Sequence, residues 1–247
     1  MVVAKITVTS AATIPRMNSE RVLHISWLST SRPSGSVPNR CMAEGAAGTA
    51  AASWMEAAGN IGALSPARPK TGKSLAKDFR PPSSGGEVGP YYKEIVGRSK
   101  AILANLDKEF PALAGKGYQL TGFGWHQGWN DRVNQAFNDE YEKNMANFIR
   151  DIRKDLGVGG LPFVIAETGM TGPNESHPRA LSLMKAQAAV AGYPEFKGNV
   201  AFVGTKAFWR EKEDSPSGQG YHWNTNAETY YLIGESMGQA MKGLCNK

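Results

Sequence analysis

Helical and strand-like segments alternate through the last two-thirds of this 247-residue chain. Apolar residues recur at helical spacing over 90–110, between Pro90 and Pro111, and a short strand is expected at 118–123. The same criteria predict a helix over 137–156, a strand over 161–166, a helix over 180–191, a strand over 199–204 and a helix over 226–241, the last opened by a capping box of Thr225 and Glu228. Strands that alternate with helices pair in parallel through right-handed crossovers. The pattern therefore predicts an α/β fold of three layers, α/β/α, doubly wound around a mainly parallel sheet.

Chemically active residues gather where the expected strands end. In a doubly wound sheet, ligands bind beyond the carboxyl ends of the strands, and the loops 125–131, 167–172 and 205–222 leave from that edge. The first loop belongs to Gly122-Phe-Gly-Trp-His-Gln-Gly-Trp-Asn-Asp131, which combines aromatic, amide, imidazole and carboxylate groups. The third ends in Gly220-Tyr-His-Trp-Asn224, with a second histidine just before a helix. Such groups on loops at one edge indicate a hydrolase.

Composition argues against several other classes of protein. The formal net charge of +6 comes from dispersed Lys and Arg without a long basic run, which favours solubility over nucleic-acid binding. No apolar run approaches the ~20 residues that a membrane span requires, so no membrane partner is expected. Cys41 and Cys245 lack the spacing of zinc ligands, and no metal or cofactor is expected. No secretory signal is recognisable at the start of the chain.

The composition of the chain changes near residue 75. Before that position there is no Asp, Phe, Tyr or Gln, and hydrophobic periodicity is poor. We therefore divide the chain into an atypical segment, 1–70, and a domain, 71–247. The atypical segment is either a non-native sequence, such as a frame-shifted reading, or a divergent or disordered extension. A non-native segment would leave the fold without its first strand, and translation of the coding DNA in the other two frames separates the alternatives.

Three segments, in order, resemble the sialate O-acetylesterase domain family. They are Gly72-Lys-Ser-Leu-x-x-Asp-Phe-Arg-Pro-Pro82, the segment 122–131, and Tyr221-His-Trp-Asn-x-Asn-Ala-Glu-Thr-Tyr230. The family belongs to the SGNH hydrolases and is close to carbohydrate esterase family six, which includes acetyl xylan esterases. The resemblance implies a flavodoxin-like SGNH fold and a secreted or periplasmic protein. It also implies an acetylated carbohydrate as substrate, hydrolysed by a serine nucleophile without metal or cofactor.

The resemblance also assigns roles to single residues. His222 resembles the general base of the family, Gln127 its amide donor to the oxyanion, and Gly72 the glycine whose backbone N–H also donates. The residues expected to shape the acyl and sugar pocket are Trp125, Trp129, Asn130 and Asp131. Taken alone, His222 could instead be a structural residue before a helix, either tryptophan could belong to the core, and His126 is more simply a scaffold residue.

Two positions depart from the pattern of the family. The Gly-Gln-Ser-Asn-like turn that carries its nucleophile is absent, and we assign no nucleophile among Ser19, Ser26, Ser29, Ser31, Ser34 and Ser36. The position three residues before the histidine, often Asp in SGNH enzymes, is Gln219. Asp214 is preferred over Glu213 as the acid that orients His222. These departures leave open whether the chain is an O-acetylesterase or a catalytically inactive carbohydrate-binding remnant.

A phosphate-binding loop is a distant third interpretation. The run from Ala67 to Ser74 fits the loosest form of that motif, in which Lys73 and backbone N–H groups would hold phosphate. However, Pro66 and Pro69 disfavour the preceding strand, and prolines at 81 and 82 would shorten the following helix.

Glu167 follows an expected strand at the edge of the sheet where ligands bind. Its position is equally compatible with orienting groups of the pocket and with capping a loop.

Overall fold

The computed structural model describes the backbone of residues 3–9 and 22–28, together with residues 73–109, 111, 114–115 and 119–246. The strands are β1 (Val3–Thr9), β2 (Val22–Leu28), β3 (Gln119–His126), β4 (Phe163–Ala166) and β5 (Val200–Val203). The helices are α2 (Pro90–Ala104), α3 (Leu106–Glu109), α4 (Trp129–Val133), α5 (Gln135–Asp155), α6 (Pro178–Ala191) and α7 (Ala227–Cys245). Short 3-10 segments are η2 (Pro82–Ser84), η4 (Gly172–Asn174), η5 (Pro194–Phe196), η6 (Lys206–Phe208), η7 (Lys212–Asp214) and η8 (Gly220–Thr225). No helix among the described residues is long and apolar enough to span a membrane.

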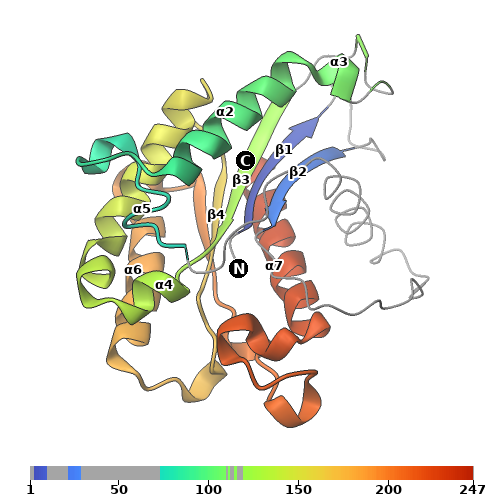
Figure 1. Cartoon of the computed structure of the whole chain (residues 1–247). Helices are drawn as coiled ribbons and strands as arrows, with labels where there is room; N and C mark the ends of the chain where they lie inside the picture. The colour runs from blue at the N-terminus through green and yellow to red at the C-terminus, as the bar shows by residue number, and fades with distance from the viewer. Residues whose placement is uncertain are drawn as a thin grey trace, which may run out of the picture.

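The five strands form one sheet in the order β2-β1-β3-β4-β5 (Figure 1). The pairs β3–β4 and β4–β5 are parallel, as the alternation of strands and helices predicts. Strand β1 instead runs antiparallel to both β2 and β3, so the sheet is mixed. Both β1 and β2 come from the atypical segment, in which the sequence analysis identified no strand. A strand from that segment therefore lies beside β3 in the middle of the sheet.

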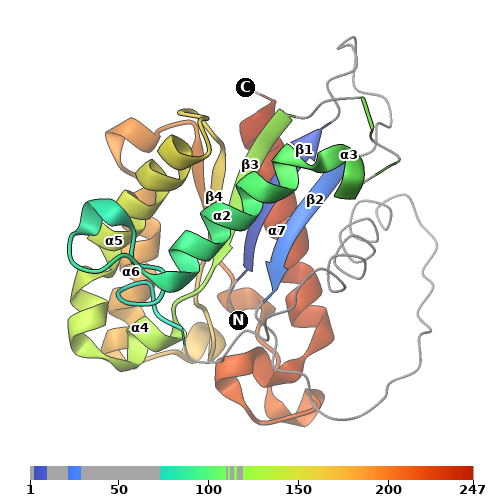
Figure 2. The same cartoon turned by 45° about the horizontal axis from the view of Figure 1, so that its top comes forward.

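Helices cover both faces of the sheet and complete the three layers. On one face, α5 and α6 pack against the odd-numbered side chains of β4, Phe163 and Ile165, and α2 adds its apolar side chains to the same buried cluster. On the other, α7 packs Ile233 and Met237 against the even-numbered Val164 and Ala166. Figures 1 and 2 show α7 on this side of the sheet, with the 3-10 segments η6 and η8 beside its N-terminal end. Because both faces of β4 are covered, its side chains are buried without alternation, as the continuous apolar run predicted.

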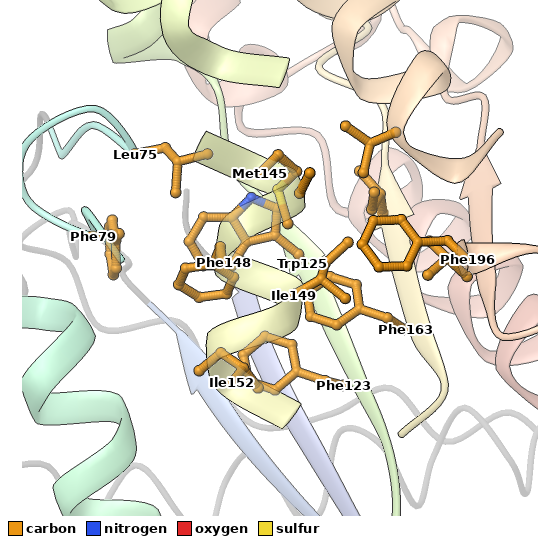
Figure 3. Close-up of a cluster of buried hydrophobic side chains, with 14 of the residues drawn as sticks. Leu75, Phe79, Phe123, Trp125, Met145, Phe148, Ile149, Ile152, Phe163 and Phe196 are labelled. Carbon is orange, nitrogen blue, oxygen red and sulfur yellow. The ribbon is translucent and has the colours of Figure 1, made fainter. Parts of the chain in front are cut away.

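The larger core lies between the sheet and α5. Phe123 and Phe163, on neighbouring strands, stack with ring centroids 4.9 Å apart, and Phe148 of α5 lies 4.5 Å from the ring of Trp125 (Figure 3). Leu75 and Phe79, from the turn that precedes α2, bury themselves in the same cluster. The turn that carries the first of the three family-like segments is thereby fixed to the body of the domain.

The ends of two helices differ from the sequence prediction. The expected helix over 90–110 breaks at Asn105, whose side chain donates to the carbonyl of Ala101 (2.9 Å), and α3 follows as a separate turn. The predicted capping box at α7 is wrong. Asn226 is the N-cap, and its Oδ1 accepts from the N–H of Thr229 (3.1 Å), while Thr225 has a left-handed backbone with φ +59°.

Candidate active site

Strand β3 extends into the first motif, which the sequence analysis placed in a loop. Because successive side chains of a strand point to opposite faces, Trp125 and His126 are separated. Trp125 is fully buried in the larger core, where it contacts Phe79 edge-on at 5.3 Å (Figure 3). His126 lies on the face covered by α7, with its ring 6.0 Å from that of Trp223. The structure thus places Trp125 in the core, one of its two expected locations.

Asp131 joins the first motif to the turn that begins at Lys73. Its Oδ2 accepts from the N–H of Leu75 (2.8 Å) and its Oδ1 from the N–H of Ala76 (2.9 Å). Gln127 Nε2 donates both to Asp131 Oδ2 (2.6 Å) and to the carbonyl of Lys73 (3.0 Å). Burial raises the pKa of the Asp131 carboxyl to about 6, and these N–H donors oppose the rise. Asp131 is fully buried and binds the chain itself rather than facing a sugar.

A second set of bonds fixes the backbone of Gln127. Its carbonyl accepts from the hydroxyl of Tyr141 (2.9 Å) and from Nε2 of Gln187 (3.0 Å). Gln187 also accepts from the N–H of Thr168 through its Oε1 (2.8 Å), and so joins the loops after β3 and β4. The sequence analysis missed Gln187. One signal was present, because a lone glutamine four residues after Leu183 and three before Val190 falls on the apolar face of α6.

His126 is buried without an ordinary hydrogen bond at either ring nitrogen. Its side chain is 1% exposed, and burial lowers its pKa to about 3, against a smaller opposing backbone interaction with Glu167. The imidazole is therefore neutral at physiological pH. This location agrees with the scaffold role that the sequence analysis favoured for His126.

The second motif adopts an unusual backbone. Trp223, Asn224 and Thr225 have φ values of +52°, +51° and +59°, three successive left-handed residues without a glycine. Such a conformation costs roughly 1–2 kcal/mol per residue, less for asparagine. One hydrogen bond and one buried side chain hold the segment in place. Asn224 Nδ2 donates to the carbonyl of Arg210 (3.0 Å), and Trp223 is fully buried. Strain held by surrounding contacts is a feature of functional segments.

The backbone of His222 is fixed while its imidazole is not. Its N–H donates to the carbonyl of Gln219 (2.8 Å), and its carbonyl accepts from the hydroxyl of Tyr230 (2.7 Å). The side chain is half-buried, and its desolvation lowers the pKa of the imidazole. Within the described part of the chain, the imidazole makes no hydrogen bond or ion pair with any acid or hydroxyl. The described residues therefore fix the backbone of His222 and make no hydrogen bond with its ring.

The predicted partner of His222 does not reach it. The side chain of Asp214 is exposed, and its backbone carbonyl accepts from Asn226 Nδ2 (3.1 Å). No bond joins Asp214 or Glu213 to His222 among the residues that the structure describes. Gly72, the predicted backbone donor, lies outside the described residues, as do the side chains of the six candidate serines.

The two motifs meet through their aromatic rings. Trp129, at the start of α4, lies with its ring centroid 5.6 Å from that of Tyr221, and the Tyr221 ring lies 4.4 Å from that of His222. His126 and Trp223 form the second contact between the motifs. Asn130 lies beside Trp129 and is partly buried, and its side chain makes no hydrogen bond with another described residue. Segments almost 100 residues apart in sequence thus share one edge of the sheet, as predicted.

Glu167 has a structural role at this edge. Its Oε2 accepts from the N–H groups of Thr205 (2.9 Å) and Lys206 (3.3 Å), which ties the end of β4 to the loop after β5. Within the described ranges, no group of three or more His, Cys, Asp or Glu residues could hold a metal ion.

The turn after residue 72 does not have the geometry of a phosphate loop. Residues 75–79 form a turn, where a phosphate loop requires a helix. Lys73 Nζ forms an ion pair with Asp78 (3.0 Å), and Asp78 also accepts from the N–H of Ser74 (2.9 Å). The lysine is therefore engaged within its own turn, and the motif stabilises a corner of the fold.

Comparison with known proteins gives one family and one structure. The model of a family described as carbohydrate esterase, sialic acid-specific acetylesterase matches residues 34–242. No curated protein matches the sequence. A crystal structure of a protein from Arabidopsis thaliana is similar over 65% of this chain, with 16% sequence identity and a TM-score of 0.40, and the match spans 57% of that protein's length.

Proposed function

This chain belongs to the carbohydrate esterase family of sialic acid-specific acetylesterases, and we propose that it hydrolyses acetyl esters on a carbohydrate with His222 as general base. One observation carries the proposal beyond family membership. The two motifs meet at the edge of the sheet where ligands bind in such folds, and there the imidazole of His222 is partly exposed and makes no hydrogen bond with any described residue.

The state of His222 suits proton transfer. Desolvation lowers the pKa of its imidazole, so the ring is neutral at neutral pH and can accept a proton from an attacking hydroxyl. In the proposed reaction that oxygen bonds to the acetyl carbon, and the imidazolium returns the proton to the departing sugar oxygen. Water then releases acetate by the same route. The fixed backbone of His222 keeps the ring in place through both steps.

Gln127 and Asp131 have positioning roles in this proposal. Both N–H groups of the Gln127 amide are already donated, to Asp131 and to the carbonyl of Lys73. To serve an oxyanion, as the resemblance implies, the amide would have to exchange one of these bonds. We therefore propose that Gln127 and Asp131 hold the wall of the site, while substrate contacts come from Trp129 and its neighbour Asn130.

The test is release of acetate by the full chain. Acetylated xylan, O-acetylated sialic acid and p-nitrophenyl acetate serve as substrates for the wild-type protein and for His222→Ala. Loss of a general base lowers turnover by about 10²- to 10⁴-fold. His177→Ala is the matched control, because His177 is an exposed residue before α6, and it should retain the wild-type rate.

A second function is favoured by a specific observation. No hydroxyl among the described residues hydrogen-bonds the His222 imidazole, and we assign no nucleophile. A catalytically inactive carbohydrate-binding protein would use the same aromatic edge without ester chemistry. Sugar binding without release of acetate from any of the three substrates selects this second function, and equal rates for wild type and His222→Ala reject the proposed base.

A further inference from the structure

We propose that Tyr221 is the platform on which the sugar ring of the substrate stacks. The inference rests on the proposed function, because it assumes a carbohydrate at the edge shared by the two motifs. It adds a residue that the sequence analysis did not assign. It also separates recognition of the sugar from the chemistry at the acetyl group.

Tyr221 is the exposed aromatic ring at this edge. It is 41% exposed, while Trp125 and Trp223 are fully buried and Trp129 is partly buried. Its ring lies 4.4 Å from the imidazole of His222, so a sugar stacked on it would present its ester next to the proposed base.

Trp129 contacts Tyr221, with 5.6 Å between the ring centroids. The guanidinium of Arg132 lies over the Trp129 ring, 4.4 Å from its centroid, and Arg132 also forms an ion pair with Glu175 (3.0 Å). The side chains of that pair are only 15% and 4% exposed. Trp129 therefore contacts both Arg132 and Tyr221 and is partly buried. Of the two neighbouring rings, Tyr221 offers the larger exposed surface to a sugar, and Trp129 contributes at its border.

The chemistry of tyrosine suits a sugar. The C–H groups of a pyranose present an apolar face that packs on an aromatic ring, while its hydroxyls need hydrogen-bond partners. The Tyr221 hydroxyl makes no hydrogen bond with any described residue. It can therefore donate to or accept from a sugar hydroxyl while the ring covers the apolar face.

The experiment measures binding of sugars that cannot be hydrolysed. Xylo-oligosaccharide and free sialic acid are titrated into the full chain, and the Kd is compared among wild type, Tyr221→Ala, Tyr221→Phe and Tyr231→Ala. Tyr231 is the matched control, because it is 39% exposed on α7 and has no aromatic partner among the described contacts. Loss of a well-placed aromatic contact raises Kd by about tenfold in Tyr221→Ala. Tyr221→Phe should lie between, and Tyr231→Ala should bind as wild type.

Two results overturn the inference: the same Kd for Tyr221→Ala and wild type, or no binding of either sugar to the wild-type chain. Hydrolysis of p-nitrophenyl acetate, which has no sugar, tests the proposed function separately. Tyr231→Ala, outside the proposed site, should keep the wild-type rate on it. If no acetate is released while sugar binding still depends on Tyr221, the esterase proposal fails and the platform stands.

Discussion

The two motifs each place a histidine next to a tryptophan, with opposite results. In the first, Trp125 and His126 end a strand, and the two side chains are buried on opposite faces of the sheet. In the second, His222 precedes a left-handed turn that buries Trp223 and leaves the imidazole partly exposed. The same pair of residue types therefore forms a buried scaffold in one place and part of the proposed site in the other. Backbone geometry, rather than residue type, decides which histidine can meet a substrate.

The hydrogen bonds of the two regions differ in the same way. Around the first motif, side chains bind side chains and backbone: Asp131, Gln127 and Gln187 connect the turn after residue 72, β3 and α6. Around the second motif, hydrogen bonds from the described residues go to the backbone of His222, and none of them reaches its ring. Substitutions in the first region should therefore reduce stability, and substitutions in the second should reduce activity.

The largest expected effect on stability is that of Asp131→Ala. The substitution leaves the buried N–H groups of Leu75 and Ala76 without an acceptor and removes one acceptor of Gln127. Since each unsatisfied buried group costs about 1–3 kcal/mol, the free energy of unfolding should fall by roughly 3 kcal/mol or more. Denaturant titration measures the change. Asp139→Ala is the control, because Asp139 bonds Gln135 on an exposed surface, and its loss should cost less than about 0.5 kcal/mol. Equal losses of unfolding free energy in the two variants would show that the bonds of Asp131 do not stabilise the fold.

The next effect is the pH dependence of stability contributed by His126. Burial lowers its pKa to about 3 in the folded chain, whereas an unfolded histidine titrates near 6.5. Between these values the unfolded chain binds a proton that the folded chain excludes, so the free energy of unfolding falls as the pH is lowered. The slope is at most about 1.4 kcal/mol per pH unit. His126→Phe should lose this slope, which unfolding at several pH values between 4 and 7 would reveal.

Asp131 and His222 also titrate, and their contributions to the pH dependence of stability must be separated from that of His126. Asp131 contributes a slope of the opposite sign, because its raised pKa makes the folded chain bind the extra proton between about 4 and 6. The difference between wild type and His126→Phe isolates the histidine from this term. His222→Ala should change the slope less, because His222 is only half-buried. A wild-type slope that survives in His126→Phe would show that His126 is not the buried neutral residue described above.

The smallest expected effect on stability is that of Tyr230→Phe. The Tyr230 hydroxyl donates to the carbonyl of His222, and loss of such a bond costs about 1 kcal/mol. Because this bond positions His222, kcat should fall several-fold with little change in KM. Steady-state kinetics on p-nitrophenyl acetate measures the split. Tyr231→Phe is the adjacent exposed control and should leave both constants unchanged. A change in KM alone would mean that Tyr230 contacts the substrate instead.

Much of the fold followed from the periodicity of the sequence. The helices α5, α6 and α7 and the strands β4 and β5 lie close to their predicted positions, because their apolar residues face a single layer or are buried on both sides. The meeting of the two motifs also followed, since parallel strands deliver their loops to one edge. Strands β1 and β2 were missed, although Ile6-Thr-Val-Thr9 and Leu23-His-Ile-Ser-Trp27 alternate apolar and polar residues, because these runs are short and lie in a segment of atypical composition. The family match begins at residue 34, within that segment, where no motif had been recognised.

The site was harder to predict than the fold. The sequence located the segment that holds Asp131 but predicted that its carboxylate contacts a sugar. Nothing in the spacing shows that the N–H groups of Leu75 and Ala76, 56 and 55 residues away, donate to it. Tyr221 was passed over beside His222, since exposure of a ring depends on its neighbours in space. The left-handed turn at residues 223–225 gave no signal either, because only Asn224 is a residue type that favours that backbone.

The most direct test of the two roles measures stability and turnover together in His126→Ala and His222→Ala. We predict that His222→Ala loses at least about 10²-fold in turnover of p-nitrophenyl acetate while its unfolding free energy stays within about 0.5 kcal/mol of wild type. We predict that His126→Ala loses about 2 kcal/mol or more of stability, because a buried ring leaves a cavity, while its folded molecules keep turnover within about tenfold. The reverse pattern, or equal losses in both variants, would contradict the assignment of scaffold and base.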